Sequence, residues 1–386
     1  MLFINLECRG IFLLFILLKN NLWLEEEFFC NIKILDINFW IIFLIFLLYL
    51  IILIVEISFK LRLNLLFVVL INVIITRNFL TFFFYYEIIF IIIIFVIILL
   101  GYSYERLIAG YLIIFYSFLF SRPVLIMLLI FDFNFLIKNW LCYSFLIVLF
   151  MVASFIVKFP IFGFHYWLPI AHVEASTVGS ILLAGILLKT GSVGLFYIIL
   201  YLRFIVKFHW LLLRVRVVIL IILRLRDLKI IIAYSSIAHI RIVFYVIILG
   251  SWVAKQGCLL ILFYHGFVSS LIFWLVGLLR WWKTRSLIVI KFISFSYLII
   301  LIIFFLCILN IGFPPFMGFL REVLILKSLR VNWIILFICI ISVLFRAYYN
   351  IYFFWCFNRS IGLLFKINIY RIDIFIFMCF SFFLNF

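Results

Sequence analysis

Long, almost uninterrupted apolar runs are the feature that most restricts what this sequence can fold into. The stretch FFFYYEIIFIIIIFVIILL, residues 82–100, contains a single charged residue. A helix crosses the hydrocarbon core of a membrane with about 20 mostly apolar residues, and runs of this kind recur along the chain. Hydrophobic residues make up 71% of the chain and charged residues 11%, far from the balance of a soluble domain. The sequence therefore predicts a membrane protein.

The length of the runs indicates helices, because the short alternating segments typical of a membrane β-barrel are absent. We expect an all-α polytopic membrane protein with about 12–15 transmembrane helices. No cleavable signal peptide is expected, and the first apolar stretch predicts an anchor. The predicted spans are 38–57, 61–76, 79–101, 107–121, 123–137, 141–157, 177–202, 204–223, 230–250, 257–280, 286–309, 315–329, 331–357 and 371–386, with a shorter candidate at 10–19.

The net charge of +18 fits contact with membrane lipids. Many basic residues lie near predicted span ends, where long side chains reach the headgroups. The run LRVRVVILIILRLRDLK, residues 213–229, intersperses its charges with apolar residues, so it lacks the basic face of a nucleic-acid-binding protein. The eight cysteines form no CxxC pair, which predicts neither a metal site nor a disulfide framework.

Ionisable residues inside or beside the apolar runs are the informative exceptions. A charge at the bilayer centre costs at least about 2.5–3.5 kcal/mol on insertion scales, so such residues indicate function. One alternative is a buried ion pair that only fixes helix register. Acid, base and imidazole groups together favour a path for protons instead. The five positions are Glu87, Lys189, Lys229, His265 and Glu322.

Two stretches place proline and glycine at membrane depth, residues 158–176 and 310–323. Unwound helices of this kind line wet cavities in transporters. The first stretch contains His165 and His172, but Pro169 lies between them and no third ligand is evident, which argues against a metal site. It also contains half of a zinc deaminase signature, without the cysteines that complete it.

The first broken stretch continues into a specific motif, KFPIFGFHYWLPIAHVEASTVGSILLAGILLKTGSVG. It resembles the signature of chain 4 of proton-pumping NADH:ubiquinone oxidoreductase, respiratory complex I. DLKIIIAYSSIAHI, YHGFVSSLIFWL and NIGFPPFMGFLREVLIL continue the similarity, which covers about residues 79–330. The resemblance implies an antiporter-like fold with two discontinuous helices and inverted repeats. The Phe, Leu and Ile bias is typical of a mitochondrially encoded copy, which implies a multi-pass protein of the mitochondrial inner membrane.

The resemblance also implies roles for the ionisable residues. Glu87 and Lys189 would pair across the bundle, and opening this pair would send a proton through Lys229 and His265 to Glu322 for release. Quinone reduction in other subunits would drive the transfer. For His239 two interpretations stay open, a secondary member of the relay or a packed, hydrogen-bonded histidine.

The chain has no nucleotide loop or flavin site, so the resemblance places NADH, FMN, iron–sulfur clusters and ubiquinone in other subunits. The expected partners are other membrane-arm subunits, including neighbouring antiporter-like chains, and lipids, but no nucleic acid. The predicted parts are shortened, divergent N-terminal helices at 1–78, a proton-translocating core at 79–330 and C-terminal helices at 331–386. One early helix is expected to be missing, reduced or supplied by another protein.

Two positions depart from the family pattern. Ser176 replaces the usual proline after HVEA, and Arg321 replaces the glycine before Glu322. Adjacent residues on a helix point about 100° apart, so we expect Arg321 to snorkel toward the headgroups and not to pair with Glu322. Two other functions stay open: a cation/proton antiporter subunit, and a structural membrane scaffold whose polar residues only lock helices together.

Overall fold

The computed structural model describes residues 60–76, 79–101, 105–130, 145–160, 163–202, 221–222, 224–249, 251–279, 293–295, 297–314, 316–328, 333–358 and 363–365. The predicted spans at 10–19, 38–57 and 371–386, and most of 204–223, lie outside the described residues. Within the described ranges the fold is helical except for two short parallel strands, β1 (Ile293–Phe295) and β2 (Leu363–Phe365).

The helices follow the apolar runs of the sequence. Their bounds are α3 (Lys60–Ile75), α4 (Phe79–Leu100), α5 (Arg106–Ile130), α7 (Phe145–Lys158), α8 (Trp167–Glu174), α9 (Thr177–Leu182), the π-helical turn η3 (Leu183–Leu187), α10 (Leu188–Leu202), α13 (Leu228–Leu249), α14 (Trp252–Leu279), α16 (Tyr297–Ile311), α17 (Met317–Ser328) and α18 (Trp333–Asn358).

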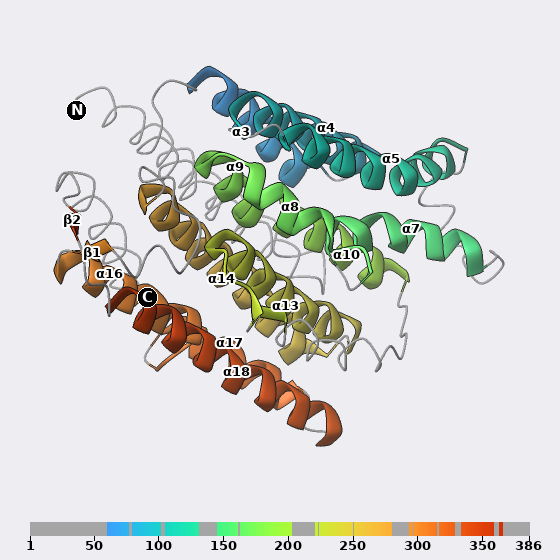
Figure 1. Cartoon of the computed structure of the whole chain (residues 1–386). Helices are drawn as coiled ribbons and strands as arrows, with labels where there is room; N and C mark the ends of the chain where they lie inside the picture. Colours follow the sequence, from blue (N-terminus) through green and yellow to red (C-terminus); the bar gives the residue numbers. More distant parts are fainter. Residues whose placement is uncertain are drawn as a thin grey trace, which may run out of the picture.

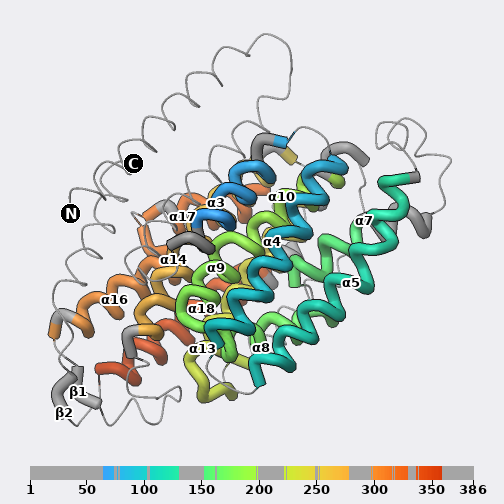
Figure 2. Tube along the Cα trace, turned by 90° about the horizontal axis from the view of Figure 1, so that it is seen from above, coloured from blue at the N-terminus to red at the C-terminus, as the bar shows by residue number. Residues whose placement is uncertain are grey.

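The helices form layers that follow chain order (Figure 1). The first layer is α3, α4 and α5, the second is α7 to α10, the third is α13 and α14, and the last is α16 to α18. Packing between α4 and α9, α9 and α14, and α14 and α17 joins the layers. Seen from above in Figure 2, α9 and α14 overlap near the centre, with α5 and α16 toward opposite sides. The apolar windows of Thr177–Phe196, of α13 and of α14 are 100%, 89% and 89% buried, so these helices form the interior.

Six helical segments of the described chain are long and apolar enough to cross a membrane, which confirms the predicted fold class of a polytopic helical membrane protein. They are Phe79–Leu100, Arg106–Leu129, Thr177–Phe196, Leu228–Ile247, Val253–Gly277 and Cys339–Asn358. The apolar window of the third segment is entirely buried, whereas only 28% of that of the second is buried. Exposed apolar side chains on α5, such as Phe115 and Leu129, give this helix a face suited to lipid.

Both predicted breaks occur. Between α8 and α9, Ala175 is extended, and the Oγ of Ser176 accepts a hydrogen bond from the backbone N–H of Gly179 at 3.1 Å. Ser176, in place of the expected proline, thus caps the start of α9. Between α16 and α17, Gly312 has a φ of 84°, a left-handed conformation that a residue with a side chain rarely adopts. The first break thus separates α8 from α9, and the second separates α16 from α17.

One predicted boundary is wrong. The spans at 107–121 and 123–137 were expected to be separate, but α5 continues from Arg106 to Ile130 with Pro123 inside the helix. Membrane helices tolerate an internal proline when neighbours compensate for the freed backbone groups, and α5 packs against α4, α7 and α8. Residues 131–137 lie outside the described residues.

Close packing of α10 on α7 leads to a first testable prediction. A Cβ added at Gly194 would stand 2.0 Å from Cε1 of Phe155. Phe155 cannot yield easily, because it is fully buried and packs on Tyr86 and Phe83 of α4. Gly194→Ala is therefore expected to destabilise the fold by about 1–3 kcal/mol, measured as a lower thermal unfolding midpoint.

Gly110→Ala is the matched control for this prediction. At Gly110, an added Cβ would meet only the flexible side chain of Ile98, at 3.2 Å, so little loss of stability is expected. Equal midpoints for the two variants would contradict the close contact between α10 and α7.

Candidate functional site

The buried ionisable residues begin at α4, where Glu87 forms an ion pair with Lys158 at the end of α7. The ammonium of Lys158 also lies 4.1 Å from the ring centroids of Tyr86 and Phe90. Residues 86, 87 and 90 share one face of α4 by their helical spacing. An aromatic face attracts a cation, so this face of α4 holds Lys158 with one carboxylate and two rings.

The expected direct pair between Glu87 and Lys189 is therefore wrong for this structure. The Nζ of Lys189 donates instead to the backbone carbonyl of Ala184, five residues earlier. The physical reason is the π-helical turn η3, which ends just before Lys189. Such a turn alters the α-helical bonding pattern, and a carbonyl within it accepts the bond from the lysine. Lys189 is 2% exposed.

Helix α10 nevertheless packs closely on α4 and on the end of α7, two residues after Lys189. A Cβ added at Gly191 would stand 3.1 Å from the hydroxyl of Tyr86 and 3.8 Å from the backbone of Lys158. Gly191 belongs to the same turn of α10 as Lys189. The absence of a side chain at Gly191 thus allows α10 to approach Tyr86 and the backbone of Lys158 closely.

Lys229, at the start of α13, is bound at the broken end of α8. Its Nζ donates to the carbonyl of Ala175 at 2.7 Å and to that of Val173 at 3.3 Å. The last carbonyls of a helix lack partners within the helix and attract cations. The helix break predicted from the sequence therefore creates the binding site of the second lysine.

His239 of α13 and His265 of α14 stack on each other with ring centroids 4.5 Å apart. Both are buried, and the Nε2 of His239 and both ring nitrogens of His265 have no hydrogen-bond partner in the protein. The structure thus brings together two histidines from separate helices.

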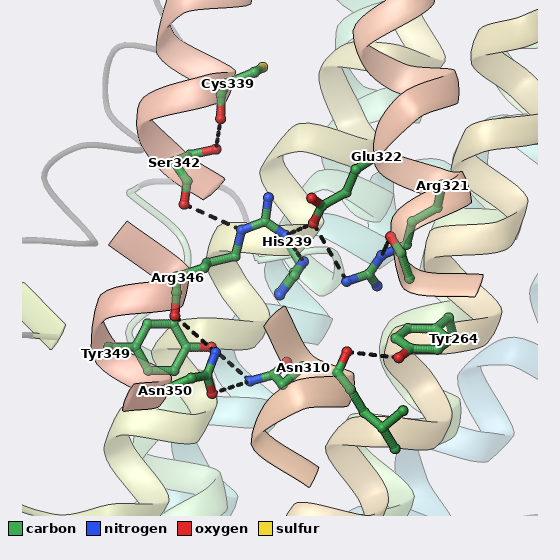
Figure 3. A network of polar contacts seen from close by, with 12 residues as sticks. His239, Tyr264, Asn310, Arg321, Glu322, Cys339, Ser342, Arg346, Tyr349 and Asn350 are labelled. Atoms are coloured by element: carbon green, nitrogen blue, oxygen red, sulfur yellow. Dashed lines mark hydrogen bonds and ion pairs between the residues drawn. The ribbon is translucent and has the colours of Figure 1, made fainter. Parts of the chain in front are cut away.

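Arg346 of α18 joins His239 to Glu322 of α17 (Figure 3). Its Nη1 donates to Oε1 of Glu322 at 2.8 Å and lies 3.3 Å from Nδ1 of His239. Because a guanidinium only donates, Nδ1 of His239 is the acceptor, and a neutral His239 carries its proton on Nε2. His239 is therefore a bonded member of a charged network.

The expectation that Arg321 snorkels to the headgroups is wrong. Its side chain is 1% exposed, its guanidinium lies 4.6 Å from the ring centroid of Tyr264, and its Nε donates to the carbonyl of Gly318. Packing of α17 on α14 encloses this side chain. Its Nη2 forms an ion pair with Oε1 of Glu322 at 4.0 Å, so the expectation that the two residues do not pair is also wrong, although the pair is not bidentate. Two guanidinium groups nevertheless surround one carboxylate.

A neutral polar cluster adjoins this network (Figure 3). The amide nitrogen of Asn310 donates to the hydroxyl of Tyr349 at 2.8 Å and to the side-chain carbonyl of Asn350 at 3.0 Å, and Asn350 donates to the backbone of Arg346. A cavity of about 20 Å³ borders the three side chains and Ser235, which is room for about one water molecule.

Sequence reasoning missed two members of the site, Lys158 and Arg346. Lys158 ends an apolar run, so it resembled the many basic residues near span ends. Arg346 lies within the predicted span 331–357, and a charge inside a span was the signal that would have identified it. Among the described residues, no group of three or more His, Cys, Asp and Glu side chains is placed to hold a metal ion.

Comparison with known proteins finds a family described as NADH:quinone oxidoreductase/Mrp antiporter, TM, which matches residues 76–346. The chain is similar to NADH-ubiquinone oxidoreductase chain 4 of Ceratitis capitata, with 35% identity over 268 residues, 65% of this chain and 60% of that protein. The same chain of Aedes aegypti is 36% identical over 272 residues, 66% of this chain and 60% of that protein. The matches to these two curated relatives thus span about 60% of their length.

The fold is similar to solved membrane complexes. A chain of respiratory complex I from Thermus thermophilus aligns with a TM-score of 0.69 and 21% identity, covering 84% of this chain and 73% of that one. A chain of the Mrp complex from Dietzia aligns with a TM-score of 0.72 and 14% identity, covering 86% and 65%. At these identities the likeness concerns the fold, and it agrees with the predicted antiporter-like architecture.

Proposed function

Because this chain belongs to the NADH:quinone oxidoreductase/Mrp antiporter transmembrane family, we propose that it is a proton-translocating membrane-arm subunit of NADH:ubiquinone oxidoreductase. The observation that carries this proposal is the series of ionisable side chains through adjacent interior helices. Lys158, Lys189, Lys229, His239 and His265 are each at most 3% exposed. Ionisable groups so costly to bury in a membrane protein indicate a functional path.

In the proposed relay, Lys189, Lys229 and His265 pass protons toward Glu322. His239 bonds to Arg346, which bonds to Glu322, so both histidines lie next to the exit side. At the other end, Glu87 exchanges its partner between Lys158 and Lys189, since α10 packs closely against α4 at Gly191, next to Tyr86. Moving a carboxylate toward or away from a lysine in a low-dielectric interior changes that lysine's affinity for its proton.

The energy for this movement comes from outside the chain. We infer that NADH, FMN, the iron–sulfur clusters and ubiquinone are bound by other subunits, and that quinone reduction there displaces Glu87. The proposed partners are the neighbouring antiporter-like chains of the membrane arm and the surrounding lipids. The proposed location is the mitochondrial inner membrane.

A cation/proton antiporter subunit is the second candidate, and the fold shared with the Mrp complex favours it. The two candidate functions predict that different proteins copurify with the chain. Purification in mild detergent is expected to recover the chain with NADH:ubiquinone oxidoreductase activity. In liposomes, the purified complex is expected to move protons when NADH and quinone are supplied, as followed with a pH-sensitive dye.

Two outcomes of this experiment would contradict the proposal. One is recovery of the chain in a complex that exchanges sodium for protons and does not oxidise NADH, which would favour the antiporter. The other is recovery with an NADH-oxidising complex whose proton transport is unaffected by removal of the buried lysines, which would favour a structural scaffold.

A further inference from the structure

His172 is a buried ionisable residue that the relay described above does not use. It lies on α8 and is 0% exposed, and neither ring nitrogen has a hydrogen-bond partner in the protein. Its ring stacks on Phe273 of α14, with centroids 4.5 Å apart and an angle of 10° between the planes. The stack fixes the plane of the imidazole while leaving both of its nitrogens free to bond.

The position of His172 relates it to both lysines of the relay. Lys229 bonds to the carbonyls of Val173 and Ala175, which follow His172 on the same broken helix. The charges of Lys229 and Lys189 both act on the ring of His172. The two lysines lie on separate helices, α13 and α10, and His172 lies on a third, α8.

A packing role alone does not account for an imidazole here. Leaving a buried polar group without a partner costs the free energy of its lost hydration, and a phenylalanine would stack on Phe273 without this cost. Nearly all buried polar groups in proteins bond to protein or to ordered water. An imidazole with both nitrogens available can accept a proton on one and release another from the other.

We propose that His172 carries protons between Lys229 and Lys189, through water molecules bonded to its two nitrogens. In each transfer, one ring nitrogen takes a proton that originates from one lysine, and the other nitrogen releases its proton toward the second lysine. The ring returns to the opposite neutral tautomer, and a later reorientation or reverse exchange resets it. This inference rests on the proposed function, because it extends the same path by one residue.

His172→Phe separates the two roles, because the substitution keeps the aromatic stack and removes both nitrogens. For a residue that only packs, the complex would assemble and pump normally. For a proton carrier, we expect normal assembly, continued NADH oxidation and a loss of protons pumped per NADH equal to that in Lys189→Met. His165→Phe is the matched control, since His165 lies in the same motif and accepts a hydrogen bond from Gly163; it is expected to pump normally.

His172→Gln covers the case in which the phenylalanine variant fails to assemble. The amide can bond to water but does not titrate, so the same loss of pumping is expected. Normal pumping in an assembled His172→Phe or His172→Gln complex, with pumping lost in Lys189→Met, would overturn the role of His172 alone. Normal pumping in Lys189→Met as well would overturn the proposed function.

Discussion

Lys189→Met is expected to abolish most of the proton transport that depends on this chain and to leave assembly largely intact. Methionine keeps the length and apolar character of the side chain and removes the charge from a fully enclosed position. The bond lost is to the carbonyl of Ala184, a neutral acceptor, so no opposite charge is left unpaired. The measurement is protons pumped per NADH oxidised in liposomes that contain the purified complex.

Lys327→Met is the matched control for Lys189→Met. Lys327 lies in the last turn of α17 and is exposed, so the same substitution removes a charge that the proposed path does not use. Its pumping is expected to equal that of the unmodified complex. An assembled Lys189→Met complex with an unchanged ratio of protons to NADH would remove Lys189 from the relay.

Glu87→Gln and Lys158→Met are each expected to destabilise the fold by about 3–5 kcal/mol, and the double variant by much less. Each single variant leaves one member of the ion pair without its partner, whereas the double variant removes both charges. The measurement is a double-mutant cycle. The change in unfolding free energy of each variant is monitored through the thermal unfolding midpoint of the solubilised complex. A strongly favourable coupling energy between the two sites is the expected result.

A second cycle, with Glu87→Gln and Lys189→Met, tests the pairing that sequence similarity implied. Because Lys189 bonds to Ala184 and not to Glu87, the two losses of stability are expected to be nearly additive. Strong coupling in this second cycle and additivity in the first would show that Glu87 pairs with Lys189 and not with Lys158, contrary to the structure.

The sequence was sufficient to predict the helices whose only requirement is apolar length. The ends of α4 and α13 lie within two residues of the predicted spans 79–101 and 230–250. Proline and glycine also predicted both breaks, because these residues change the backbone in a way that does not depend on distant neighbours. Pro123 failed as a boundary because packing against other helices decides whether a proline ends a membrane helix.

The partners of the charged residues were not predictable to the same degree, because they depend on contacts between helices far apart in the sequence. The position of Lys158 at the end of an apolar run is typical of an interfacial lysine, whereas in the fold its ammonium contacts the rings of Tyr86 and Phe90. The angle between adjacent side chains on a helix says which way Arg321 points. It does not say that α14 packs on α17 and buries this side chain. Membership of Glu87, Lys189, Lys229, His265 and Glu322 in a proton relay stays a prediction for the pumping experiments.

The carbonyl that holds Lys189 has a consequence for how position and charge are linked. A carboxylate partner competes for the lysine's proton and loses its attraction when that proton leaves. The oxygen of Ala184 carries no titrating proton, and it accepts a hydrogen bond from an ammonium or from a neutral amine alike. The π-helical turn therefore holds Lys189 by a hydrogen bond that forms whether or not the lysine is charged. In the proposed relay, Lys189 would keep this anchor in both of its protonation states, so that each turnover begins from the same geometry.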